Sequence, residues 1–184
     1  VTFPLSPFIN QIIQDLIDTY ETIACAGIAA NQIGYEYQIF IGMKEIKTED
    51  EAEEIEKKEA ELSSASGNPY ADNYEIYINP QIDLTNNKST KIDEEGCLSI
   101  PGLMVERKRF DEIKVRYYDA NGKKNKKRLS GFLSKLFQHE LDHLNGMLMI
   151  DGQEKIENLY PLEASEEQAK LYGTLYSQYQ KLIK

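Results

Sequence analysis

Two histidines four residues apart are the first residues whose types and spacing indicate chemistry. His139 and His143 are the only histidines in the chain, and Glu140 directly follows the first of them. On a helix, side chains four positions apart lie on one face, so both imidazoles can bind a single metal ion. The neighbouring carboxylate can then take a proton from a water molecule that the ion has made more acidic. The pattern predicts a divalent metal site with Glu140 as the general base.

The histidine pair leaves one ligand to be found, because a catalytic metal usually has three protein ligands and one open position. Cys97 is the candidate: Gly96 before it allows close backbone approach, and the apolar Leu98 after it would exclude water. A lone cysteine is more often a small buried apolar residue than a ligand. We nevertheless predict that Cys97 is the third ligand, because the segments around it and around the histidines form a recognisable set.

That set of segments resembles the peptide deformylase family. The chain reads CAGIAANQ at 25–32, EGCLS at 95–99 and QHELDH at 138–143. The second and third segments match the family motifs throughout, and the first differs only where Cys25 replaces a glycine. The resemblance extends from about Phe8 to Asp151. It implies an α+β fold, with mixed or antiparallel sheets wrapped around a central metal-binding helix, in one catalytic domain over 1–184.

The resemblance also implies a reaction: hydrolysis of the N-terminal formyl group of N-formylmethionyl nascent peptides, with release of formate. The cofactor would be one divalent ion, Fe²⁺ in the cell and replaceable by Ni²⁺, Co²⁺ or Zn²⁺, held by Cys97, His139 and His143. Glu140 would take the proton of water and deliver it to the leaving amine. The backbone N–H of Leu98 and the side-chain amide of Gln32 would stabilise the oxyanion.

Substrate contacts and structural support follow from the same resemblance. The backbone at Ala26 and Gly27 would pair with the extended peptide, as in strand addition. Phe132 and Leu136 either line the pocket for the methionine side chain or are plain core residues. Three further residues would support the cysteine segment, with an ion pair between the first and the last: Glu95, Gly96 and Arg109.

Two other functions stay open. A zinc metallopeptidase shares the histidine motif and would take a third ligand from Asp151, Glu154 or Glu157, which leaves the EGCLS segment unexplained. A divergent deformylase-like protein with an altered substrate or little turnover is favoured by the short segment before the first helix. Cys25 beside the substrate path and Asn31, where the family often has proline, favour that second alternative too.

Composition limits the partners. The net charge of −10 over 184 residues argues against general nucleic-acid binding, since phosphates would repel the chain. No stretch approaches the roughly 20 apolar residues of a membrane span. Two cysteines are too few for a secreted disulfide framework, which favours the cytoplasm, with an organelle left open. We expect a monomer that acts on formylated peptides, with the ribosome as one setting.

Local patterns predict the elements that would position these residues. Ser6-Pro7 signals the start of a helix over 7–22. Apolar runs predict strands at 37–43, 75–79, 88–92 and 112–119, and helical spacing returns from Leu129 to Asn145-Gly146. A last helix is expected over 163–183. An acidic surface insertion is expected at about 44–68, with nine acidic and four basic residues over 44–62, and the basic run at 123–128 is expected in a solvated hairpin.

Overall fold

The computed structural model describes residues 1–45, 57, 67–85, 88–151 and 158–161. The helix expected over 163–183 and most of the acidic insertion therefore lie outside the described residues. The chain divides into two compact units. The first comprises Val1–Lys91 and Arg109–Met147, and the second comprises Ile92–Lys108 and Leu148–Lys184. The single domain over 1–184 stays a prediction.

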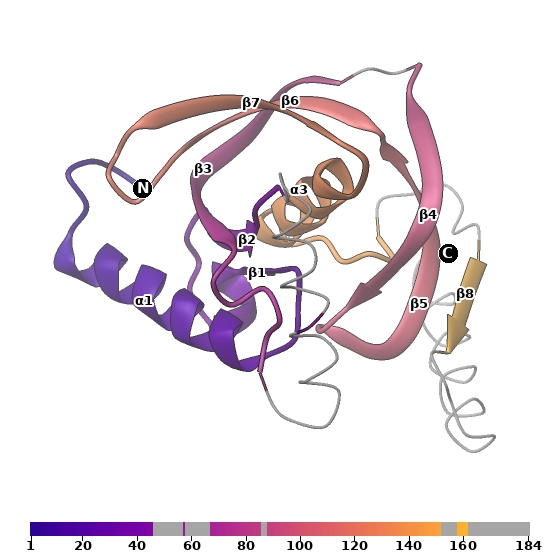
Figure 1. The fold of residues 1–184 in the computed structure, drawn as a ribbon, viewed down its shortest axis with the longest axis horizontal. Helices are drawn as coiled ribbons and strands as arrows, with labels where there is room; N and C mark the ends of the chain where they lie inside the picture. Colours follow the sequence, from indigo (N-terminus) through magenta and orange to yellow (C-terminus); the bar gives the residue numbers. More distant parts are fainter. Residues whose placement is uncertain (46–56, 58–66, 86–87, 152–157, 162–184) are drawn as a thin grey trace. The chain divides into compact units, whose positions relative to one another are not determined.

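The first unit is built on an antiparallel five-stranded sheet with the strand order β1-β2-β3-β6-β7. Figure 1 shows this sheet curving around helix α3, which confirms the predicted α+β architecture. The strands of this sheet are β1 (Gly27–Ala29), β2 (Ile39–Met43), β3 (Tyr74–Thr85), β6 (Glu112–Tyr118) and β7 (Lys124–Ser130). Its helices are α1 (Pro7–Thr22), the short 3₁₀ helix η1 (Ala30–Ile33) and α3 (Gly131–Leu144).

Helix α1 begins and ends where the sequence predicts. The hydroxyl of Ser6 accepts a hydrogen bond from the backbone N–H of Ile9 at 3.3 Å, and Pro7 occupies the first helical position. The proline has no N–H to leave unsatisfied there, which favours this starting point. The buried residues of α1 recur at helical spacing and contact one face of the sheet: Ile9, Ile12, Ile13, Leu16 and Tyr20.

Strand β2 is buried on both faces, which explains its continuous apolar run. Ile39 and Ile41 pack in the cluster under α1, while Phe40 between them packs on the opposite face against Phe137 of α3. Side chains alternate between the two faces of a strand, so a strand between two helices must be apolar at every position. The rings of Phe40 and Tyr77 stack on the α3 side, with centroids 4.4 Å apart.

The second unit contains a three-stranded sheet in the order β4-β5-β8. Its strands are β4 (Thr90–Cys97), β5 (Ile100–Phe110) and β8 (Asn158–Pro161), of which β4 begins and β5 ends in the first unit. The pattern predicted only the start of β4 and missed β5. The run IPGLMVERKRF contains five charged or proline residues, so its alternation is weak. Of its two neighbours in the sheet, β4 precedes it directly, and β8 lies about 55 residues later in the chain.

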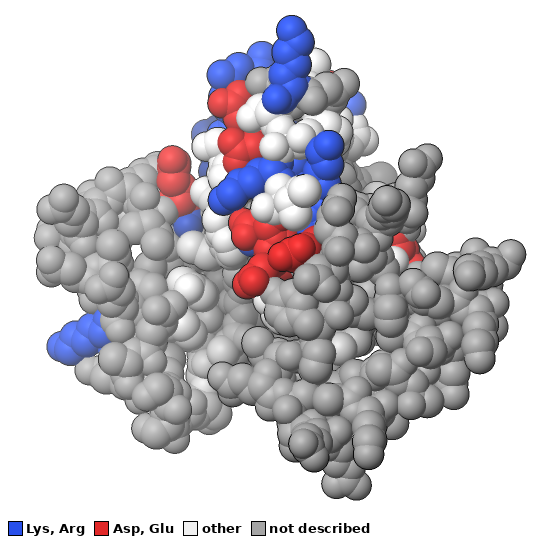
Figure 2. All heavy atoms as spheres, turned by 90° about the vertical axis from the view of Figure 1, so that its right-hand side faces the viewer, with Lys and Arg blue, Asp and Glu red and all other residues white. Residues whose placement is uncertain are grey.

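Surface charge is mixed. Figure 2 shows basic and acidic side chains interspersed on one face of the described residues. None of the described helices is long and apolar enough to cross a membrane. At the end of the segment expected as a surface insertion, Asn68 is an exception because it is buried. Its side-chain amide donates to the carbonyls of Tyr20 and Cys25 at 2.8 and 3.0 Å, tying the end of α1 to the start of β1.

Candidate active site

Helix α3 presents His139 and His143 together. Their ring centroids are 4.8 Å apart, with the rings at 83° to each other, and their ligating nitrogens lie within 4.8 Å. His143 is buried and His139 is half-buried. The side-chain amide of Asn31 in η1 donates a hydrogen bond to the carbonyl of His143. Two imidazoles one helical turn apart can therefore bind the same ion, as the spacing predicts.

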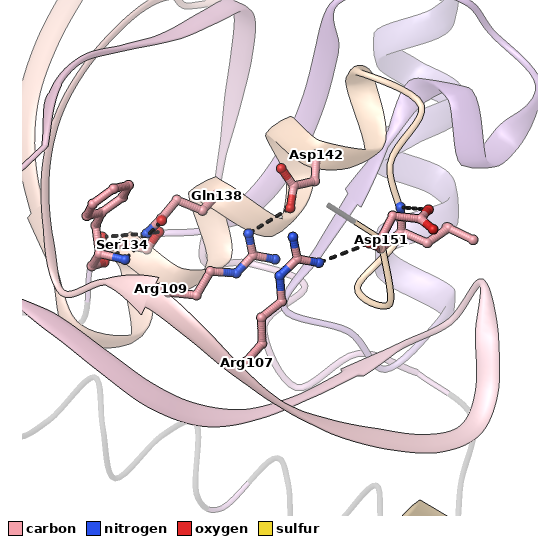
Figure 3. Close-up of polar contacts among 8 residues, drawn as sticks. Arg107, Arg109, Ser134, Gln138, Asp142 and Asp151 are labelled. Carbon is pink, nitrogen blue, oxygen red and sulfur yellow. Dashed lines mark hydrogen bonds and ion pairs between the residues drawn. The ribbon is translucent and has the colours of Figure 1, made fainter. Parts of the chain in front are cut away.

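Gln138 anchors this helix to the sheet (Figure 3). Its side-chain oxygen accepts from the N–H of Phe110 at 3.1 Å, and its amino group donates to the carbonyl of Phe110 at 2.8 Å. The hydroxyl of Ser134 donates to the same carbonyl at 2.7 Å. In the sequence, Gln138 is recognised only as part of the QHELDH motif, with no role of its own. Gln138 is a polar residue, yet it is buried, and both ends of its side-chain amide bond to Phe110. Its role is therefore to hold α3 in place.

Asp142 and Arg109 form a buried ion pair in the first unit (Figure 3). The guanidinium Nη1 lies 2.6 Å from the carboxylate Oδ2, and the two side chains are 8% and 16% exposed. The sequence predicts support from Arg109 with Glu95 as its partner, and that pair stays a prediction. Glu95 is buried in β4. Asp142 lies between the two histidines in sequence, so the pair fixes the rotation of α3 about its own axis.

Replacing Arg109 with methionine should lower the free energy of unfolding by about 3–5 kcal/mol, because it leaves the buried carboxylate of Asp142 without its cation. The matched control is Arg116→Met, which breaks the more exposed pair with Asp83, where the side chains are 44% and 29% exposed. That change should cost about 1 kcal/mol or less. Urea unfolding of both variants measures the difference. Equal losses would refute the assigned role of Arg109.

Glu140 is buried against the first residue of β1. Its side chain is 2% exposed, and a Cβ atom built on Gly27 would lie 2.7 Å from Glu140 Oε1 and 2.9 Å from Leu136 Cδ1. These separations are too short for any side chain other than hydrogen, so only glycine allows the carboxylate to lie here. Helix and strand thus approach each other closely at the residue predicted to be the general base.

Gly27→Ala should therefore displace the Glu140 carboxylate and reduce turnover by at least about tenfold, since overpacking costs about 1–3 kcal/mol. Gly42→Ala is the matched control. Gly42 pairs with Gly27 across the β1–β2 ladder, and its added Cβ would meet Leu136 Cδ2 only at 3.5 Å, an ordinary contact. The steady-state rate and the thermal midpoint should both be lower in Gly27→Ala than in Gly42→Ala. A normal rate in Gly27→Ala would show that the carboxylate position is unimportant.

Strand β1 lies at the edge of the five-stranded sheet, with one side open to an added strand among the described residues. The carbonyl of Ala26 accepts a hydrogen bond from the N–H of Met43 in β2 at 2.8 Å, so it points to β2 and not to the open side. Backbone groups alternate in direction along a strand, so those of Gly27 point to the open side. Of the two residues predicted to pair with a peptide, Gly27 is the one placed to do so.

Cys25 lies just before the edge strand β1, and its thiol is unreactive. Burial, together with the charge of Glu140, raises the pKa of its thiol to about 12, although a hydrogen bond from the Gly27 backbone opposes the shift. The thiol is therefore protonated at neutral pH and is a poor nucleophile or metal ligand. Cys25 and Cys97 form no disulfide with each other. Cys25 therefore adds a half-buried apolar group beside β1.

Gln32 is held with a defined orientation. Its side-chain oxygen accepts a hydrogen bond from the backbone N–H of Ala29 at 2.8 Å. The amino group of the amide is then the end that can donate to a developing oxyanion, as the predicted role requires.

The helix residues predicted to line a pocket differ from one another. Leu136 is buried against both glycines of the β1–β2 ladder, whereas Phe132 is 49% exposed and lies under the Lys135 ammonium.

In the second unit, Cys97 ends β4 at the turn into β5. The N–H of Ser99 donates to its sulfur at 3.4 Å, and Leu98 between them is exposed with its backbone in the turn. A Cβ on Gly96 would lie 2.9 Å from the Met104 sulfur, which confirms that this glycine allows close packing. Arg107 Nη1 donates to the carbonyl of Leu148 at 3.0 Å (Figure 3). Cys97, His139 and His143 make a candidate metal-binding set of one thiolate and two imidazoles.

Comparisons with known proteins give one consistent family. Residues 1–158 match the model for polypeptide deformylase. A peptide deformylase of Elusimicrobium minutum is 36% identical over 148 residues, covering 80% of this chain and 73% of the relative. A peptide deformylase of Erythrobacter litoralis is 30% identical, covering 84% and 80%.

Solved structures agree with the sequence relatives. A Synechococcus elongatus peptide deformylase in complex with actinonin has a TM-score of 0.58 at 28% identity, over 85% of this chain and 70% of that chain. The Thermotoga maritima peptide deformylase has a TM-score of 0.57 at 29% identity, over 83% and 87%.

Proposed function

Since the chain belongs to the polypeptide deformylase family, we propose that it is a metal-dependent hydrolase whose active site lies beside the open edge of β1. It removes the N-terminal formyl group from nascent peptides and releases formate. The observation that carries the site assignment is the buried carboxylate of Glu140. It lies between two ligating histidines in sequence and packs directly against Gly27 of the edge strand.

The donor set fits a divalent ion of intermediate softness. Two imidazoles from α3 and the thiolate of Cys97 would hold it, and three protein ligands leave one position open for chemistry. Bound there, the ion would supply Lewis acidity, which makes water acidic enough to lose a proton near neutral pH. We propose Fe²⁺ in the cell, with Ni²⁺, Co²⁺ or Zn²⁺ able to replace it. A thiolate ligand makes such a site sensitive to oxygen.

Proton transfer falls to Glu140. The carboxylate takes a proton from the attacking water and later delivers it to the amine of the leaving peptide, so one group serves as base and then as acid. Negative charge builds on the formyl oxygen between these steps. The amino group of Gln32 and the backbone N–H of Leu98 would donate to that oxygen, and each such donor is worth about 3 kcal/mol in a dry site.

The peptide would bind by strand addition to β1. The outward carbonyl of Gly27 can accept a hydrogen bond from an extended substrate, which would bring the substrate's N-terminus towards α3. The N–H of Gly27 bonds to the Cys25 sulfur instead. Leu136, and Phe132 one turn earlier on α3, would contact the methionine side chain. Glu95, Gly96 and Arg109 would support the cysteine segment and the helix. We further propose that the protein acts as a cytoplasmic monomer on formylated peptides at the ribosome.

The decisive assay measures formate release from formyl-Met-Ala-Ser by iron-loaded protein prepared without oxygen. Deformylation predicts formate from this peptide and no product from unformylated Met-Ala-Ser. Cleavage at an internal peptide bond would instead indicate a metallopeptidase. Absence of turnover by fully loaded protein would indicate a deformylase-like protein that has lost its activity.

A further inference from the structure

The β6–β7 hairpin carries a row of cations on one face of the sheet. In the ladder Lys114 lies opposite Arg128, Arg116 opposite Lys126, and Tyr118 opposite Lys124. Directly paired residues of neighbouring strands share a face. The residues between them, among them Ile113, Val115 and Tyr117, point to the α3 core. We call the resulting surface the basic face, made of Lys114, Arg116, Lys124, Lys126 and Arg128.

The basic face is not covered by α1. That helix packs on the same side of the sheet, mainly against β1, β2 and η1. Its core cluster extends to Ile76 and Ile78 of β3 and reaches β6 only at Tyr118. Among the described residues, Lys114, Lys126 and Arg128 have no carboxylate within ion-pair distance. Arg116 is partly neutralised, because its Nη1 lies 3.2 Å from Asp83 Oδ1. The face is thus a local region of positive charge on a chain of net charge −10.

This arrangement costs stability. Like charges directly opposite each other in a ladder repel, by about 0.2–1 kcal/mol for each pair. Lysines on an edge strand commonly prevent pairing with other molecules, and that would account for the charges on β7. It does not account for Lys114 and Arg116, because β6 lies between β3 and β7 and has no open edge. Repulsion at two successive pairs therefore indicates a binding role.

A cavity of about 400 Å³ opens beside the basic face. Its lining includes Arg116, Lys124 and Tyr118, together with Gln38 and Gln81. The ring of Tyr118 packs against Phe3, with centroids 4.9 Å apart. The amide oxygen of Gln81 accepts from Arg116 Nε at 2.8 Å, and the amide nitrogen of Gln38 donates to the carbonyl of Leu144 at 3.0 Å. The amide nitrogen of Gln81 and the amide oxygen of Gln38 can still bond to a ligand. The cavity therefore offers one donor and one acceptor next to Arg116 and Lys124.

We propose that the basic face binds the phosphate backbone of single-stranded RNA, with one nucleotide in this cavity. Cations on one strand recur every second residue, about 6.7 Å apart, a spacing suited to successive phosphates. The two amide ends match a ribose 2′-hydroxyl, which both donates and accepts, and this favours RNA over DNA. Net negative charge elsewhere confines binding to this face.

The test is fluorescence anisotropy of the full chain with a labelled single-stranded RNA at 50 and 200 mM salt. Wild type should bind, more weakly at the higher salt. The double variant Lys126→Glu/Arg128→Glu should lose affinity at least about tenfold and lower the salt slope by about 1.4, the share of two phosphate contacts. Its thermal midpoint should not fall, because the changes remove repulsion across the ladder.

The matched control is Lys44→Glu/Lys108→Glu, which makes the same change in net charge at exposed lysines that are not part of β6 or β7. It should change affinity by no more than about threefold, since only non-contact charge is altered. An equal loss in the control, or no RNA binding by wild type at 50 mM salt, would overturn the proposal. So would equal affinity for a DNA strand of the same sequence or for polyglutamate, the latter pointing to an acidic protein partner.

Discussion

Glu140→Ala should reduce formate release by about 10²–10⁴-fold while leaving the bound metal in place, because general acid–base catalysis contributes a factor of this size. The carboxylate is buried and packs against Gly27, so its loss leaves the imidazoles of α3 where they are. The expected result is a fall in kcat with about one metal ion still bound per chain. Rate measurements paired with metal analysis on the same preparation check both parts.

Glu36→Ala is the matched control, since Glu36 is an exposed glutamate in the same unit. Its rate should equal that of wild type. Should Glu140→Ala turn over at the wild-type rate, Glu140 would not be the base. Should it lose its metal as well as its activity, the carboxylate would be needed to hold the ion, and the assigned proton transfer would lack support.

The second large effect is expected from Cys97→Ala. Removing one of three ligands should weaken metal binding by at least about 100-fold, beyond the effect of changing a residue that merely orients a ligand. The rate should fall with the metal content. Analysis of protein purified without oxygen, before and after dialysis against a chelator, measures the loss.

Cys25→Ala supplies an internal control with the same chemical change. Because burial raises the pKa of the Cys25 thiol to about 12, this cysteine stays protonated at neutral pH and should contribute nothing to metal binding. Full metal retention by Cys97→Ala, with a loss confined to Cys25→Ala, would reverse the ligand assignment. Loss in neither variant would remove thiolate from the site altogether.

The histidine pair and the first helix could be predicted because their signals are local. Four-residue spacing places His139 and His143 on one face of any helix, whatever surrounds it. Ser6 and Pro7 likewise fix the start of α1 through hydrogen bonds and a missing N–H within the same turn. The family motifs added Cys97 and Gln32. These predictions needed only neighbours in the chain.

Tertiary structure alone decided what these groups contact. The close approach of Glu140 to Gly27 joins residues over 110 positions apart, and the ion pair of Arg109 with Asp142 was not predicted from the sequence. Strand β5 was missed because its charged residues and proline weaken the alternation of its sequence, and one of its two neighbours, β8, lies far along the chain. The basic run at 123–128 can be recognised in the sequence. Only the register of β6 with β7 shows that Lys114 and Arg116 lie opposite it on the same face. Local periodicity encodes which side of an element is apolar; it carries no record of which distant element will be packed there, since that choice depends on the combined burial of the whole unit.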